Sequence, residues 1–141
     1  MRKLDEVSKY IKVKRQMVYN KILKFYKEKS VAEDQHIDGL FKYVDSLYRA
    51  HLMAKISVET RNLSGKDLQH QIDIREDNLE RMKSALSEKF DLNFVDKIMN
   101  LYNELAKRDT QMHKLKNYGY FKRRKVVKSV CDEMRNEEKT I

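Results

Sequence analysis

The chain contains no proline, no tryptophan, three glycines and a single cysteine among its 141 residues. A single cysteine excludes a disulfide framework and a cysteine-based metal cluster. No apolar run approaches the roughly 18–20 residues of a membrane span, and the N-terminal segment lacks the apolar core of a signal peptide. We therefore expect a protein of a reducing, soluble compartment: the cytoplasm or, in a eukaryotic host, the nucleus.

The scarcity of helix breakers leaves long stretches free to be helical, because proline removes a backbone donor and glycine lowers helix propensity. Apolar residues recur at steps of three, four and seven, which places them on one face of a helix. No segment shows the alternation of apolar and polar residues that is typical of strands. The predicted helix faces consist of Leu4, Val7, Ile11, Val18, Ile22 and Phe25; Ile37, Leu40, Phe41, Val44, Leu47, Tyr48, His51 and Ala54; Leu68, Ile72, Leu79, Met82 and Leu86; Val95, Ile98, Met99, Tyr102, Leu105 and Met112; and Phe121, Val127, Val130 and Met134.

Four short segments interrupt these faces and predict where the helices end. Ser30 and Glu33 have capping-box spacing, which predicts that the second helix begins at Ser30. Residues 61–67, 91–93 and 117–120 carry the other expected turns, since they contain glycine or residues that favour helix caps.

We expect one all-α domain over residues 1–141, an elongated antiparallel bundle of four to five helices. Its first helix is the basic segment 1–29, and residues 136–141 are expected to fray. An extended coiled coil that completes its core by oligomerising is the alternative. The apolar face of the second helix is wider than the seam of a two-stranded coil, so we favour the bundle and leave a dimer open.

Charge is unevenly distributed along the chain, which has 31 Lys and Arg against 22 Asp and Glu, a net charge of +9. Residues 1–30 carry a net charge of +7, residues 31–112 −3, residues 113–130 +7 and residues 131–141 −2. The middle of the chain is therefore an ordinary scaffold, and the positive charge lies near the two ends of the sequence. This distribution predicts an acidic partner, for which nucleic acid is the first candidate.

The second basic segment, residues 113–128, interleaves seven cations with aromatic residues and contains no carboxylate. Lysine and arginine neutralise phosphates, while exposed aromatic rings stack on unpaired bases. This combination predicts contact with single-stranded DNA or RNA in preference to duplex. Residues 122–125 also match a short nuclear-localisation pattern. The candidate nucleic-acid-binding residues of the segment are Lys114, Lys116, Tyr118, Tyr120, Lys122, Arg123, Arg124, Lys125 and Lys128.

The first predicted helix carries a second cationic stripe beside its apolar face. Lys14, Lys21 and Lys24 are the candidate nucleic-acid contacts of this stripe, because their spacing could follow a phosphate backbone. The same face could instead dock an acidic protein helix, rest on an anionic membrane or remain a solvated surface. The whole stripe consists of Lys3, Tyr10, Lys14, Met17, Lys21 and Lys24.

Two single residues are predicted to be structural. His51 lies between Leu47 and Ala54 on the apolar face of the second helix, where a histidine is more often a hydrogen-bonded core residue than a ligand. Cys131 follows Val130 on the last helix and is predicted to be a half-buried packing residue.

Two acidic residues each precede a histidine by three positions, Glu33 before His36 and Asp67 before His70. This spacing occurs in di-iron helical bundles. Both pairs lie in predicted first helical turns, where the carboxylate suits a capping role, and the other predicted faces carry no inward glutamate. We therefore expect no metal and no cofactor.

Arg108 and His113 are separated by four residues, with polar Asp109 after the arginine and apolar Met112 before the histidine. This Arg-x4-His sequence resembles the motif of the HEPN superfamily, all-helical domains that include metal-independent ribonucleases and usually work as dimers. The resemblance implies that Arg108 and His113 of two protomers converge on a site for RNA cleavage. An imidazole can move a proton there while a guanidinium stabilises charge on the phosphorane.

The leading hypothesis is a non-enzymatic nucleic-acid-binding protein, weakly sequence-specific and an accessory subunit of a nucleoprotein complex with other protein subunits. The sequence contains no zinc module, recognition-helix motif or glycine-rich phosphate loop. Two alternatives stay open. One is a HEPN-like ribonuclease that uses Arg108 and His113, and the other is an adaptor that docks an acidic protein partner.

Overall fold

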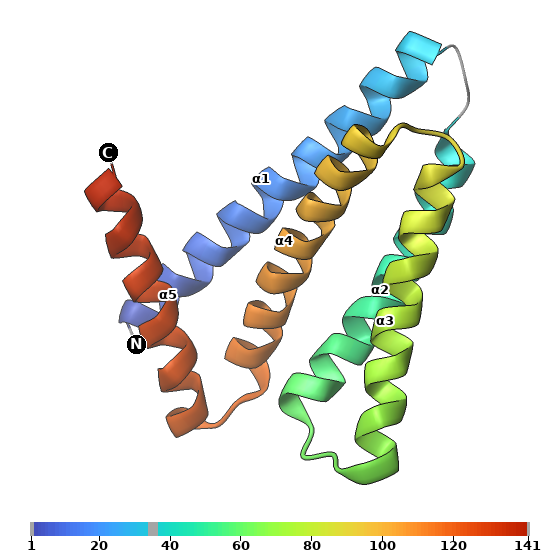
Figure 1. The fold of residues 1–141 in the computed structure, drawn as a ribbon. Coiled ribbons are helices and arrows are strands. Elements are labelled where there is room, and N and C mark those ends of the chain that lie inside the picture. Colours follow the sequence, from blue (N-terminus) through green and yellow to red (C-terminus); the bar gives the residue numbers. More distant parts are fainter. Residues whose placement is uncertain (1, 34–36, 141) are drawn as a thin grey trace.

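The computed structural model describes residues 2–33 and 37–140, which form a bundle of five α-helices (Figure 1). The expected all-α bundle is confirmed. Its longest helix extends over about 48 Å at 1.5 Å per residue. The helices are α1 (Arg2–Glu33), α2 (Asp38–Thr60), α3 (Gly65–Ser87), α4 (Leu92–Asn117) and α5 (Tyr120–Thr140).

The central element is the antiparallel pair of α1 and α4, which lie side by side along most of their length (Figure 1). At one end of this pair the rings of Phe25 and Phe94 meet edge to face, 5.8 Å between their centroids. Farther along, Ile22 and Ile98 are fully buried in the main apolar cluster. Asp91 begins α4 by accepting a hydrogen bond from the Phe94 backbone N–H at 2.8 Å, as expected for a helix cap.

Helices α2 and α3 form a helical hairpin that closes the main core from one side. The predicted face of α2 is confirmed, because Val44, Leu47, Tyr48 and Ala54 are all buried. Helix α3 begins at Gly65, whose φ of +57° lies in the left-handed region that favours glycine.

A polar contact inside the bundle joins three helices at Asp109 of α4. Its carboxylate accepts hydrogen bonds from Nε of Arg15 in α1 at 2.5 Å and from the hydroxyl of Tyr48 in α2 at 2.7 Å. Because both oxygens are used, this contact specifies how α2 sits against the central pair as well as adding to its stability.

Helix α5 packs across the start of α1 and the end of α4 (Figure 1). Val7, Ile11, Leu115 and Val130 form a second, smaller apolar cluster there. Lys3 and Leu4 lie near the start of α5, and Tyr10 and Lys14 contact Glu137 near its end. The two helices therefore cross with their starts on the same side (Figure 1).

The predicted helix start at Ser30 is wrong. Helix α1 continues through Ser30 to Glu33, beyond the expected boundary at residue 29, and α2 begins at Asp38. Tertiary contacts hold the last turns of α1 helical, since the Lys29 ammonium lies over the ring of Phe94, 5.2 Å from its centroid. A capping-box spacing alone does not terminate a helix that still has a partner to pack against.

The last helix differs from the expectation at both of its ends. Phe121, predicted to be apolar core, is 79% exposed. It lies nine residues from buried Val130, which places the two on opposite sides of a helix, about 180° apart. The segment 136–141 was expected to fray, yet α5 continues to Thr140 because Glu137 binds α1.

His51 is a hydrogen-bonded core residue, as predicted. It is 6% exposed, and its Nδ1 lies 2.8 Å from the backbone carbonyl oxygen of Arg75 in α3. Burial lowers the pKa of His51, and this effect outweighs the opposing contribution of that hydrogen bond. The neutral imidazole therefore donates from Nδ1 to α3 and joins the two helices of the hairpin.

The free energy of unfolding is expected to fall as the pH decreases from about 7 to about 5. A lowered pKa in the folded state means that the unfolded chain takes up the proton first, so acid favours unfolding. Urea denaturation at several pH values measures this slope. The variant His51→Leu is expected to flatten it, whereas the same substitution at exposed His70 of α3 is the control and retains it. An unchanged slope in His51→Leu would contradict the assignment.

Candidate nucleic-acid interface

The cations of the second basic segment lie on the outer side of the α4–α5 junction. Helix α5 turns Val127, Val130 and Met134 toward α1 and α4, which leaves most of its basic residues in solvent. No Asp or Glu occurs between residues 109 and 132, so no nearby carboxylate of the same segment neutralises them. The exposed cations are Lys116, Lys122, Arg124, Lys125 and Lys128.

Arg123 and Tyr118 shape the junction itself. The Arg123 guanidinium donates from Nε and Nη2 to the backbone carbonyl oxygen of Tyr118, at 3.3 and 2.9 Å. Arg123 thereby supplies a hydrogen-bond donor to the Tyr118 carbonyl oxygen, which has no partner within the helix because α4 ends there. The Lys122 ammonium lies over the Tyr118 ring, 5.7 Å from its centroid. These contacts hold the chain reversal between α4 and α5 in one conformation.

A cavity of about 300 Å³ lies between the start of α1 and the start of α5. We call it the α1–α5 cavity. It joins Lys3, from the first basic segment, with cations of the second, so tertiary packing brings part of the two segments together. The lining consists of Lys3, Leu4, Tyr120, Arg123, Arg124 and Val127.

On another side of α5, two adjoining cavities of about 290 and 510 Å³ form a groove toward the end of α2. We call it the α2–α5 groove. Its one carboxylate, Glu59, is bound by Lys55 at 2.6 Å and by Lys114 at 3.0 Å. Burial raises the pKa of Glu59, but hydrogen bonds from the two lysines lower it more, so the group stays ionised. The other cations that line the groove are Arg61, Lys107, Lys122 and Lys125.

The predicted cationic stripe on α1 is divided by the fold. Lys14 is bound to Glu137 at 2.9 Å, next to the end of α5. Lys21 and Lys24 are exposed farther along α1, and Lys24 lies about 31 Å along the helix from Lys3. The structure therefore brings Lys3 to the second basic segment and leaves Lys21 and Lys24 apart from it.

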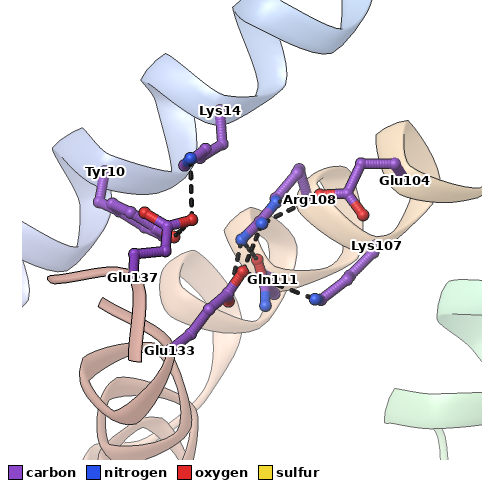
Figure 2. A network of polar contacts seen from close by, with 8 residues as sticks. All are labelled: Tyr10, Lys14, Glu104, Lys107, Arg108, Gln111, Glu133 and Glu137. Atoms are coloured by element: carbon purple, nitrogen blue, oxygen red, sulfur yellow. Dashed lines mark hydrogen bonds and ion pairs between the residues drawn. The ribbon is translucent and has the colours of Figure 1, made fainter. Parts of the chain in front are cut away.

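Arg108 of the Arg-x4-His sequence is buried in a polar network (Figure 2). It is 2% exposed and donates to both carboxylate oxygens of Glu133 in α5, at 3.1 and 2.5 Å. Glu104 accepts from Nε at 3.1 Å, and Gln111 from Nη1 at 3.3 Å. Burial lowers the pKa of Arg108, but the hydrogen bonds that it donates to Glu133 and Glu104 and the charges of these carboxylates more than offset this effect and raise the pKa overall.

His113 lies on a different side of α4 from Arg108. Five residues along a helix correspond to a rotation of about 140°. The His113 ring contacts Asn117 one turn further on, with 3.4 Å between Nδ1 and the amide nitrogen. Within one chain the two side chains therefore do not converge on a common site.

A second part of the same network holds the end of α5 to α1 (Figure 2). The Tyr10 hydroxyl donates to Glu137 at 2.7 Å, and the Tyr10 ring lies 5.6 Å from the Arg108 guanidinium carbon. Hydrogen bonds from Lys14 and Tyr10 lower the pKa of Glu137. Burial raises the pKa of Glu133, but the hydrogen bond from Arg108 has the larger effect, so the pKa is lowered overall. Two of the α5 carboxylates, Glu133 and Glu137, thus bind α4 and α1, while most cations of the helix face solvent.

Several contributors to this surface could not be identified from the sequence. Lys55, Arg61 and Lys107 join the α2–α5 groove although they lie far from residues 113–128 in the chain. Glu133 carried no motif that would link it to Arg108. The nearest signal was the change from cations to carboxylates within α5, which suggests two functions for one helix.

The two pairs with di-iron spacing, Glu33 with His36 and Asp67 with His70, form no metal site in the described part of the chain. His36 lies outside the described residues, and Asp67 and His70 are exposed on α3. Among residues 2–33 and 37–140, no three His, Cys, Asp or Glu side chains are grouped closely enough to hold a metal ion. None of the described helices is long and apolar enough to cross a membrane.

Comparison with known proteins adds no relative: no protein-family model, no curated protein and no solved structure matches this chain. The fold and the surface therefore define only a class, a five-helix bundle whose last helix presents cations outward and is anchored through Glu133 to the buried Arg108.

Replacing Arg108 with alanine is expected to loosen α5. Removing one partner of a buried ion pair costs roughly 3–5 kcal/mol, and Glu133 is 26% exposed, so we expect a loss of about 2–3 kcal/mol. Hydrogen exchange should accelerate in α5 more than in α2 and α3. Arg135→Ala, which removes an exposed ion pair with Asp132, is the control and should change stability by less than about 0.5 kcal/mol. Unchanged protection of α5 in Arg108→Ala would contradict this role.

Proposed function

We propose that the protein is a non-enzymatic nucleic-acid-binding protein that contacts phosphates with the outer side of the α4–α5 junction. The observation that carries the proposal is the cluster of exposed cations on α5, which continues into two cavities on different sides of the helix. Phosphates are the polyanions that such a surface neutralises most effectively, through release of counterions.

The character of the surface favours weak sequence specificity and an unpaired strand. Its exposed cations are mainly lysines, which act as point charges on flexible stems, and the phosphate contacts that such charges make carry no sequence information. Tyr120 and Phe121 are exposed beside them, and such rings stack on bases of any sequence. We further propose that the protein acts in the cytoplasm or nucleus, as an accessory subunit of a nucleoprotein complex.

Reversing the charge of Lys122, Arg124, Lys125 and Lys128 with glutamate is expected to weaken binding of single-stranded RNA or DNA by at least about 100-fold at low salt. Arg123 is left in place because it holds the Tyr118 carbonyl. Fluorescence anisotropy at several salt concentrations measures the affinity and its salt slope.

A matched control replaces four exposed lysines elsewhere with glutamate and so changes the net charge equally: Lys42, Lys66, Lys83 and Lys89. This variant is expected to lose much less affinity. Equal losses in both variants would show that net charge alone acts, and no binding by the wild type would contradict the proposal. In that case, co-purification of an acidic protein would favour the adaptor alternative.

RNA incubated with the protein in EDTA is expected to remain intact. The Arg108 donors are occupied by Glu104, Gln111 and Glu133, so a substrate phosphate would have to displace them. Gel analysis of an end-labelled RNA checks this outcome. Cleavage that disappears in His113→Ala would instead support the ribonuclease alternative, with a site assembled from two protomers.

A further inference from the structure

The α1–α5 cavity differs chemically from the rest of the basic surface. Its lining combines three cations with an aromatic ring and two aliphatic side chains, from helices at opposite ends of the sequence. Four other cavities on the described surface each include at least one carboxylate, such as Glu28 and Asp91, Glu59, or Glu133 and Glu137. An anionic ligand with an apolar part therefore fits the α1–α5 cavity better than it fits those four.

We propose that the α1–α5 cavity binds one unpaired nucleotide, with its base against Tyr120 and its phosphate among Lys3, Arg123 and Arg124. This inference rests on the proposed nucleic-acid binding and specifies the place at which a base is held. A volume of about 300 Å³ lies at the lower end of the range of small-ligand pockets and suits a single nucleotide.

The aromatic wall is available for stacking. Tyr120 is 56% exposed although it lines the cavity, and its ring meets the Phe121 ring edge to face with 5.4 Å between centroids. That contact supports the orientation of the tyrosine ring and leaves ring surface accessible. Leu4 and Val127 supply the apolar surface that a base, unlike a free phosphate, covers on binding.

The cationic wall is partly pre-organised. The bonds from Arg123 to the Tyr118 carbonyl fix its guanidinium, and Nη1 is free of that contact and can donate to a phosphate. A fixed guanidinium loses less entropy on binding than a mobile one. Lys3 and Arg124 are exposed at the rim, where they add charge from two helices.

The experiment compares a short labelled strand of uridines with the same strand lacking its bases, using the full chain and fluorescence anisotropy. The wild type is expected to bind the base-bearing strand about tenfold more tightly. Tyr120→Ala is expected to reduce this ratio at least threefold, with any remainder supplied by Phe121, and to leave the affinity for the abasic strand unchanged. Tyr43→Ala is the matched control, because Tyr43 is also half exposed, at 50%, but lies on α2.

A second variant tests the contribution of α1. Lys3→Gln is expected to lower the salt slope of strand binding by roughly 0.7–1, which corresponds to one phosphate contact, whereas exposed Lys9→Gln is expected to leave it unchanged. Comparing strands with a 5′-phosphate and a 5′-hydroxyl identifies the source of the phosphate. If the 5′-phosphorylated strand binds more tightly and this difference depends on Lys3, the cavity holds the terminal nucleotide. If the two strands bind equally, the cavity holds an internal nucleotide.

The outcomes separate this inference from the proposed function. If the wild type binds both strands but Tyr120→Ala keeps the tenfold ratio, the cavity does not hold a base and the proposed function stands. If the wild type binds neither strand, the proposed function fails. Tyr120-dependent binding to phosphatidylserine vesicles without strand binding would overturn both. Melting curves for each variant confirm that the bundle remains folded.

Discussion

The placement of the basic surface depends on the ion pair between Arg108 and Glu133. Helix α5 has only a small apolar cluster with α1 and α4, centred on Val130. The buried guanidinium binds Glu133 through two nitrogen atoms, and such a bidentate contact defines orientation as well as distance. A buried pair contributes modestly to net stability but strongly penalises any arrangement in which one partner is left alone. The ion pair therefore specifies the position of α5 more than it increases the stability of the bundle.

This anchoring also explains how one helix carries opposite charges. Near the end of α5, Glu133 and Glu137 are turned toward Arg108, Tyr10 and Lys14. Near its start, the cations have no inward carboxylate to meet and remain in solvent. Because Glu133 and Glu137 are paired with other helices, the exposed side of α5 near its start is more positive than the composition of the whole helix indicates. The proposed phosphate contacts and the proposed nucleotide cavity both follow from that separation.

The parts of the fold that could be predicted from the sequence are the buried faces of single helices. The face of α2 from Val44 to Ala54 was predicted because apolar spacing reports directly on which side of a helix is buried. Local patterns failed where tertiary contacts compete with them. Ser30 has the spacing of a helix start, yet Lys29 and its neighbours pack on α4 and extend α1. Phe121 is apolar but exposed, because helix geometry places it opposite Val130.

The all-helical bundle, the two basic segments and the core role of His51 could be predicted from the sequence, because they depend on periodicity, composition and nearest neighbours. The grouping of the cations depends instead on how the helices pack. Lys3 joins Arg123 and Arg124 across the α1–α5 contact, whereas Lys21 and Lys24 on the same helix as Lys3 do not. The tertiary structure also assigned Arg108 to Glu133, 25 residues away. Such pairings depend on the crossing of helices that are distant in the chain, and no local spacing encodes that geometry.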